Sequence, residues 1–212
     1  MAYRCIVFDF DGTLADTEEL AFEIYNELAK KYKYHPVTRE ELMHIKNLHI
    51  KEIMEIVDIP FYKLPRVISQ GQKRMRVREA EIRSFTPNIK TVVDGLREQT
   101  EVMGILTSNV KRTVASFLKH YAIDGDFDFL VSSALLSKQK KIRKVLKRYN
   151  LKKEELLYIG DETRDIEACH RAGVDVAAVS WGYNSVLALK RCQPTYMVER
   201  IEDILEIVKE KR

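Results

Sequence analysis

Short apolar runs alternate along most of this chain with longer stretches in which apolar residues recur every three or four positions. The short runs predict buried β-strands, and the longer stretches predict amphipathic helices that pack against them. The predicted strands cover residues 4–8, 102–106, 129–131, 156–159, 176–179 and 196–198. The predicted helices between them lie near residues 89–99, 111–121, 140–149, 164–172, 184–191 and 201–210. Continuously apolar strands separated by helices are typical of a parallel sheet that is covered on both faces, so we predict an α/β fold.

A block at about residues 18–84 interrupts this alternation, because its apolar positions follow the helical period and no convincing strand appears. Its predicted helices cover residues 18–33, 39–45, 50–57 and 65–82. We therefore expect a small helical domain of residues 17–84, inserted directly after the first strand. The remainder, residues 1–16 and 85–212, is expected to form a Rossmann-like α/β core domain.

The composition is that of a globular protein, with 45% hydrophobic and 32% charged residues. No apolar run reaches the roughly 18–20 residues that a membrane helix needs, and the N-terminal MAYRCIVFDF lacks the features of a signal peptide. We therefore expect a cytoplasmic protein without a membrane partner. The three cysteines, Cys5, Cys169 and Cys192, are scattered and are predicted to be reduced.

Basic residues are concentrated in KQKKIRKVLKR at 138–148, although the net charge of the chain is only +4. Such a run can bind nucleic acid. However, Ile142, Val145, Leu146 and Tyr149 recur there at the spacing of a helical core stripe, so most of the cations are expected to form a solvated outer face. We predict no nucleic-acid partner.

Polar motifs follow three of the predicted strands at the point where each strand ends. They are DFDGT at 9–13, TSN at 107–109 and GDETRD, which ends at Asp165, while Lys138 precedes the helix predicted near 140–149. Each motif alone has an ordinary explanation, because Asp-Gly is a common turn and Ser or Asn commonly caps a helix. Ligands of open parallel sheets bind beyond the carboxyl ends of the strands, so we expect these motifs to meet at one edge.

Four carboxylates, those of Asp9, Asp11, Asp161 and Asp165, converge at this predicted edge. Anions packed together repel, raise one another's pKa and destabilise the fold unless a cation joins them. Oxygen ligands that leave room for water and phosphate suit Mg²⁺. The electrostatics therefore predict a Mg²⁺ site.

The order of the motifs, DxDGT, then TSN, then a lysine, then GDxxxD, resembles the haloacid dehalogenase-like superfamily of phosphohydrolases. The resemblance covers essentially the whole chain and includes the insertion point of the helical block, which is similar to the C1 cap of that superfamily. It implies a Mg²⁺-dependent phosphatase that hydrolyses a small phosphorylated metabolite through an aspartyl-phosphate intermediate.

The resemblance also implies a role for each acidic residue. Asp9 is the nucleophile, and Asp11 is the general acid for the leaving oxygen and then the base for the attacking water. Mg²⁺ is implied to be held by a carboxylate oxygen of Asp9, the backbone carbonyl of Asp11 and the carboxylate of Asp161. Asp165 is implied to support the outer shell of the metal, or to position the active-site lysine.

The lysine that offsets the charge of the phosphate is best matched by Lys138, which lies a few residues before the predicted helical stripe. Lys140 and Lys141 lie close enough to be alternatives. The implied phosphate-binding set consists of Gly12, Thr13, Thr107, Ser108 and Asn109. In this set a threonine and a backbone N–H hold phosphoryl oxygens where a helix begins, and a glycine lets the chain turn past the phosphate.

Several alternatives stay open at this point. A phosphomutase would use the same residues and return the phosphoryl group to the substrate. A phosphonate-cleaving enzyme would need a Schiff-base lysine in the helical block, for which Lys30, Lys31 and Lys51 are candidates. Dehalogenation is disfavoured because it does not need Asp11 as an acid. A non-catalytic protein on this scaffold would be expected to lack some motif residues, and none is missing. The sequence leaves the oligomeric state and the identity of the phosphorylated substrate open.

Overall fold

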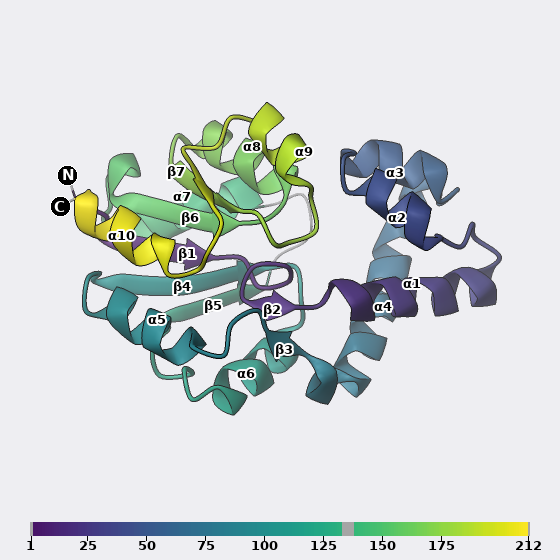
Figure 1. Cartoon of the computed structure of the whole chain (residues 1–212), viewed down its shortest axis with the longest axis horizontal. Coiled ribbons are helices and arrows are strands. Elements are labelled where there is room, and N and C mark those ends of the chain that lie inside the picture. The colour runs from purple at the N-terminus through teal and green to yellow at the C-terminus, as the bar shows by residue number, and fades with distance from the viewer. Residues whose placement is uncertain (1, 133–137, 212) are drawn as a thin grey trace.

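A six-stranded parallel sheet forms the centre of the molecule (Figure 1), as the alternating pattern predicts. The computed structural model describes residues 2–132 and 138–211. The strands of the sheet are β1 (Cys5–Phe8), β4 (Val102–Thr107), β5 (Phe129–Ser132), β6 (Leu156–Gly160), β7 (Asp175–Val179) and β8 (Tyr196–Val198). Their order is β5-β4-β1-β6-β7-β8, so β1 lies between β4 and β6. The predicted α/β fold is confirmed.

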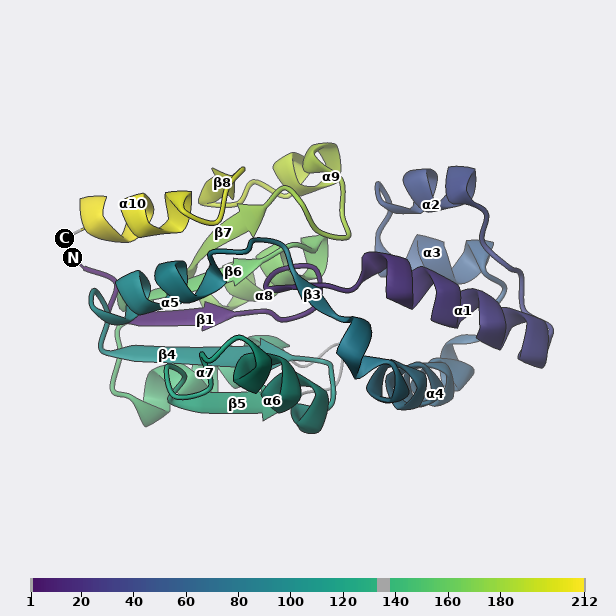
Figure 2. The same ribbon diagram turned by 60° about the horizontal axis from the view of Figure 1, so that its bottom comes forward.

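Helices cover both faces of this sheet because alternate residues of each strand point to opposite sides. Ile6 and Phe8 of β1 pack in one cluster with α5 (Ile89–Arg97), α6 (Lys111–His120) and α10 (Asp203–Glu210). Cys5 and Val7 pack in the other cluster with α7 (Lys138–Arg148), α8 (Thr163–Ala172) and α9 (Val186–Arg191). Figures 1 and 2 show α5, α6 and α10 on one face of the sheet and α7, α8 and α9 on the other.

The helices of residues 17–84, which we call the helical insert, stand beyond the carboxyl ends of the strands (Figure 2). They are α1 (Glu18–Tyr32), α2 (Arg39–Ile45), α3 (Ile50–Ile56) and α4 (Leu64–Val77), with short 3-10 helices at Phe61–Lys63 and Glu79–Glu81. The insert has a small apolar cluster of its own around Val37, Met54, Val57 and Ile59. The helical insert thus has a core of its own and lies over the edge of the sheet at which the polar motifs end.

The structure differs from the predicted elements in three places. A two-stranded antiparallel ribbon of β2 (Ala15–Asp16) and β3 (Arg83–Ser84) joins the insert to the core, and strands of two residues are too short to show an alternation. The helix predicted to end at residue 82 ends at Val77, and Arg78 pairs with Glu81 across the tighter turn that follows. Lys138 lies within α7 rather than before it.

The basic run at 138–148 forms α7 with the predicted two-sided character. Ile142 and Val145 are buried, while Lys140, Arg143 and Lys144 are exposed. Most of the cations of α7 therefore form a solvated face. Within the part of the chain that the structure describes, no helix has both the length and the apolar character needed to cross a membrane.

Candidate active site

Three neighbouring strands bring the predicted motifs to one edge of the sheet. β1 ends before Asp9, β4 ends in Thr107, and β6 ends in Gly160 immediately before Asp161. Because β1 pairs with both β4 and β6 in parallel, the residues after these strands lie side by side. The expected meeting of the motifs at one edge is what the structure shows.

A buried group of three carboxylates lies at this edge. One carboxylate oxygen from each of Asp9, Asp161 and Asp165 lies within 4.8 Å of the others. The ammonium of Lys138 contacts Asp9 Oδ2 and Asp165 Oδ1. Lys138 is 3% exposed, whereas Lys140 is exposed to solvent. Of the lysines considered from the sequence, Lys138 is therefore the one that reaches the site.

The pKa values in this group reflect burial and crowding of like charges. Burial, together with the neighbouring carboxylates of Glu162, Asp9 and Asp165, raises the pKa of Asp161 well above its usual range. Burial likewise raises the pKa of Asp165 to about 7, although Lys138 acts in the opposite direction. Burial alone would lower the pKa of the Lys138 ammonium, but the adjacent carboxylates outweigh it and raise that pKa.

The residues of this group fit a bound divalent cation. Asp165 Oδ2 is buried and finds no hydrogen-bond partner among the described residues, which is costly unless another group completes its coordination. One ammonium among three carboxylates leaves an excess of negative charge, and oxygen donors suit a hard cation such as Mg²⁺. The side chain of Asp11 does not belong to this group; whether its backbone carbonyl joins a metal stays a prediction.

The carboxylate of Asp161 is held by the chain around it. Thr13 Oγ1 donates a hydrogen bond to Asp161 Oδ1 at 2.8 Å, and the Tyr183 backbone N–H donates to Oδ2 at 2.8 Å. A Cβ added to Gly12 or to Gly182 would lie 2.1 Å or 2.2 Å from an atom of this side chain. Gly12 and Thr13 were predicted to contact phosphate, and the structure places both against Asp161.

Asp11 and Asn109 face a cavity of about 280 Å³ between the core and the insert. Asn109 Nδ2 donates to Asp11 Oδ1 at 2.9 Å, and Thr107 Oγ1 accepts from the Asn109 backbone N–H at 2.8 Å. Burial raises the pKa of Asp11, while the hydrogen bonds from Asn109 and Thr17 partly oppose that shift. Ser108 also lines this cavity. The predicted acid and the predicted phosphate-binding loop therefore open onto one space.

Sequence reasoning missed four residues that line or hold this site. Glu162 and Arg164 form an ion pair in the wall of the same cavity, although both belong to the GDETRD motif. Asn184 Oδ1 accepts from the backbone N–H of Thr163, and Tyr183 reaches Asp161 through its own N–H. The signal for Tyr183 and Asn184 was the stretch WGYN just after β7, because the carboxyl end of that strand points to the same edge.

Comparison with known proteins agrees with this fold. Residues 6–179 match the model of the haloacid dehalogenase-like hydrolase family. The chain belongs to this family, as the motifs predicted. It is 26% identical over 206 residues to the phosphoglycolate phosphatase of Synechococcus elongatus, with 97% of each chain covered.

A second relative and a solved structure extend the comparison. The chain is 26% identical over 212 residues to the pyrophosphatase PpaX of Bacillus cereus, with 98% of this chain and 97% of that protein covered. A crystal structure described as a predicted phosphatase from Clostridium acetobutylicum matches 99% of this chain and 100% of its own, with a TM-score of 0.83 and 20% identity. That structure has the same fold.

Proposed function

We propose that the protein is a Mg²⁺-dependent phosphatase that hydrolyses a small phosphomonoester through an aspartyl-phosphate intermediate on Asp9. The observation that carries the proposal is the buried group of three carboxylates with a single lysine, at the edge of the sheet where Asp11 and Asn109 line a cavity. Its family and its two phosphatase-named relatives support the same reaction class.

In this proposal Asp9 attacks phosphorus and Asp11 protonates the leaving oxygen. The Phe10 backbone N–H donates to Asp9 Oδ1 at 2.7 Å and Lys138 contacts Oδ2, so the carboxylate is oriented before substrate arrives. Asp11 then accepts a proton from the water that hydrolyses the intermediate, and its hydrogen bond from Asn109 fixes its position.

The carboxylates of Asp9, Asp161 and Asp165 would hold the metal, together with the Asp11 carbonyl that the family resemblance implies. Bound there, Mg²⁺ would supply positive charge that offsets the repulsion between a carboxylate and a phosphate and stabilises the phosphoryl oxygens. Lys138 contributes a fixed positive charge beside it, and the backbone N–H of Ser108 would hold a phosphoryl oxygen together with Thr107.

We further propose that the helical insert of residues 17–84 is a C1-type cap on a core of residues 1–16 and 85–212. Gln72 Nε2 of α4 donates to the Ser108 carbonyl at 2.5 Å. On the other side, the Lys46 carbonyl at the end of α2 accepts from Asn184 Nδ2 at 2.9 Å. These contacts support a lid that excludes water from the site and chooses the substrate.

The proposal is tested by Asp9→Asn, which removes the nucleophile but keeps the size of the side chain. We expect phosphate release from a panel of phosphorylated metabolites with Mg²⁺ to fall by at least about 10⁴-fold, with the circular dichroism spectrum unchanged. Asp16→Asn is the matched control, because Asp16 is exposed in β2, and it should keep full activity. Undiminished phosphate release by Asp9→Asn would contradict the proposed role of Asp9 as the nucleophile.

The same assay separates the alternatives that the sequence left open. A phosphomutase would release little inorganic phosphate and would isomerise its substrate instead. A phosphonate-cleaving enzyme needs a lysine beside the reacting group, whereas Lys30, Lys31 and Lys51 are all exposed and no described lysine lines the cavity that contains Asp11. No loss of activity after borohydride treatment with substrate is therefore expected.

A further inference from the structure

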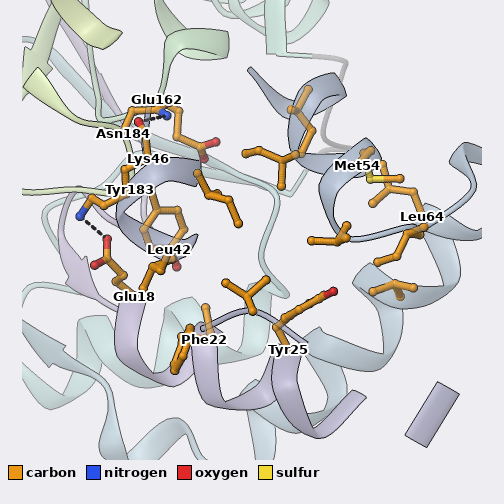
Figure 3. A pocket seen from close by; sticks show the side chains of 18 residues that line it. Glu18, Phe22, Tyr25, Leu42, Lys46, Met54, Leu64, Glu162, Tyr183 and Asn184 are labelled. Carbon is orange, nitrogen blue, oxygen red and sulfur yellow. Dashed lines mark hydrogen bonds and ion pairs between the residues drawn. The ribbon is translucent and has the colours of Figure 1, made fainter. Parts of the chain in front are cut away.

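A second cavity, of about 310 Å³, lies mainly within the helical insert. Its apolar wall is built by side chains from α1 to α4, namely Phe22, Tyr25, Leu42, Ile53, Met54 and Val67. Figure 3 shows Phe22 and Tyr25 along one side of the cavity, and Met54 and Leu64 across it from Tyr183. Packed interiors hold few voids larger than a water molecule, and small-molecule sites begin at about 300 Å³. The cavity is therefore large enough for a ligand group.

The charged groups on the wall of this cavity already have partners. Lys46 Nζ donates to Glu18 Oε2 at 2.6 Å, and Glu162 pairs with Arg164. Asn184 uses both ends of its amide, because Oδ1 accepts from a backbone N–H at 2.9 Å and Nδ2 donates to the Lys46 carbonyl at 2.9 Å. An anionic group buried here would lose water without gaining a new counter-charge, so the described lining favours an apolar occupant.

The two cavities share part of their lining. Ile50 and Leu64 of the insert, and Glu162 and Tyr183 of the core, line both the 310 Å³ cavity and the 280 Å³ cavity that contains Asp11. The apolar cavity therefore adjoins the cavity that contains Asp11 at these four residues.

We propose that the insert cavity binds the apolar portion of the substrate, an alkyl or aryl group esterified to the phosphate that reacts at Asp9. This inference rests on the proposed phosphatase function and narrows its substrate class. Phosphoglycolate and pyrophosphate, which the names of two relatives indicate as their substrates, carry a second anionic group instead. The substrate of this protein is accordingly a monoester with an apolar tail.

Chain length provides the first test. Phosphate release is measured with Mg²⁺ for ethyl, n-butyl and n-hexyl phosphate, and for phosphoglycolate as the anionic comparison. Each methylene that leaves water strengthens binding by up to about fourfold. We expect kcat/KM to rise from ethyl to hexyl phosphate by about tenfold or more, through KM, and to be lowest for phosphoglycolate.

Binding without turnover provides a second readout. Ethyl- and hexylphosphonate, in which a carbon replaces the ester oxygen, are titrated into the protein by calorimetry at several temperatures. Hexylphosphonate should bind at least about tenfold more tightly and with a more negative heat-capacity change, since apolar surface is buried. This measurement reports on the apolar subsite even if the protein hydrolyses none of the esters.

The location is tested with Ala21→Phe, because half-buried Ala21 of α1 lines the insert cavity but not the cavity with Asp11. An added ring should fill the apolar space, so the ratio of kcat/KM for hexyl to ethyl phosphate should fall to about one. Ala115→Phe makes the same change at an exposed position of α6 and should keep the wild-type ratio. Thermal unfolding of both variants verifies that they are folded.

The outcomes distinguish failure of the proposed phosphatase function from failure of the proposed apolar subsite. If no ester releases phosphate but hexylphosphonate still binds more tightly, the proposed function fails while the apolar subsite stands. If ethyl and hexyl phosphate are hydrolysed with equal kcat/KM, the subsite is overturned and the phosphatase stands. A chain-length preference that survives in Ala21→Phe overturns this location.

Discussion

Gly12 illustrates how one residue at the end of a strand is constrained by its neighbours. Its backbone has φ of 75°, which residues with a side chain rarely adopt. A Cβ at this position would also lie 2.1 Å from Asp161 Oδ2. The glycine of the Asp-Gly pair therefore makes room for the buried carboxylate that follows the adjacent strand β6, in addition to turning the chain.

Gly12→Ala is consequently expected to affect both stability and the metal site. The strained φ and the clash should lower the free energy of unfolding by about 1–3 kcal/mol, measured by urea denaturation. Displacement of Asp161 should weaken Mg²⁺ binding in a calorimetric titration. Gly125→Ala is the control, because an added Cβ there meets no atom within 4 Å. Wild-type Mg²⁺ affinity in Gly12→Ala would show that the close approach has no part in holding Asp161.

At the scale of elements, α7 decides which of several lysines serves the site. Lys138, Ile142 and Val145 are its buried residues and are spaced at i, i+4 and i+7, so they lie on one face of the helix. Lys140 is rotated away from this face and is exposed, whereas Lys141 lies at its border and is half-buried. Extending the apolar stripe by one turn toward the N-terminus would have favoured Lys138 over Lys140 from the sequence.

Lys138→Met should remove the only ammonium contact that the structure describes for Asp9 and Asp165 while keeping a long apolar side chain. Uncompensated buried carboxylates cost about 3–5 kcal/mol, so the metal-free variant should unfold at a lower urea concentration. Phosphate release with Mg²⁺ should fall by about 10²–10³-fold. Lys140→Met changes an exposed lysine of the same helix and should leave both measurements near wild type; equal effects in the two variants would contradict this assignment.

The sequence predicted all six strands of the sheet because each is a short apolar run between helical patterns. It also predicted that Asp9, Asp11, Asp161 and Asp165 would meet, since parallel strands end at one edge. The structure groups the carboxylates of Asp9, Asp161 and Asp165 but not the side chain of Asp11, and Lys138 was assigned through the family resemblance. The ribbon of β2 and β3 escaped prediction because two residues cannot show a period. The support of Asp161 by Tyr183 runs through a backbone N–H, so the residue type gave no indication of it, and only the position of Tyr183 just after β7 pointed to the site.

At the scale of the whole molecule, one loop links the helical insert to the candidate metal site. Tyr183 donates its backbone N–H to Asp161, and Asn184 Nδ2 donates to the Lys46 carbonyl at 2.9 Å. The Ser185 backbone N–H donates to the same carbonyl at 2.8 Å. Three consecutive residues therefore connect the insert to Asp161. We expect a change in the occupation of the site to alter the thermal stability of the whole molecule.

Thermal unfolding should accordingly report on occupation of the carboxylate group. A ligand that binds only the folded state stabilises it by about 2.7 kcal/mol when its concentration is 100 times Kd. For a chain of this size, that corresponds to a rise in Tm of about 5–10 °C. We expect Mg²⁺ to raise Tm by this amount and EDTA to reverse the rise, because the cation removes the repulsion among Asp9, Asp161 and Asp165.

Two variants locate the effect. Asp161→Asn removes one of the three buried carboxylates, so Mg²⁺ should leave its Tm nearly unchanged. Its Tm without metal should not fall to the extent expected for a lost ion pair, since the like-charge crowding that raises the pKa of Asp161 is relieved. Asp16→Asn, at an exposed carboxylate, should keep the full wild-type response to Mg²⁺. The same Mg²⁺ response in Asp161→Asn as in the wild type would mean that the cation binds elsewhere, and the buried group would then be a structural cluster held by Lys138.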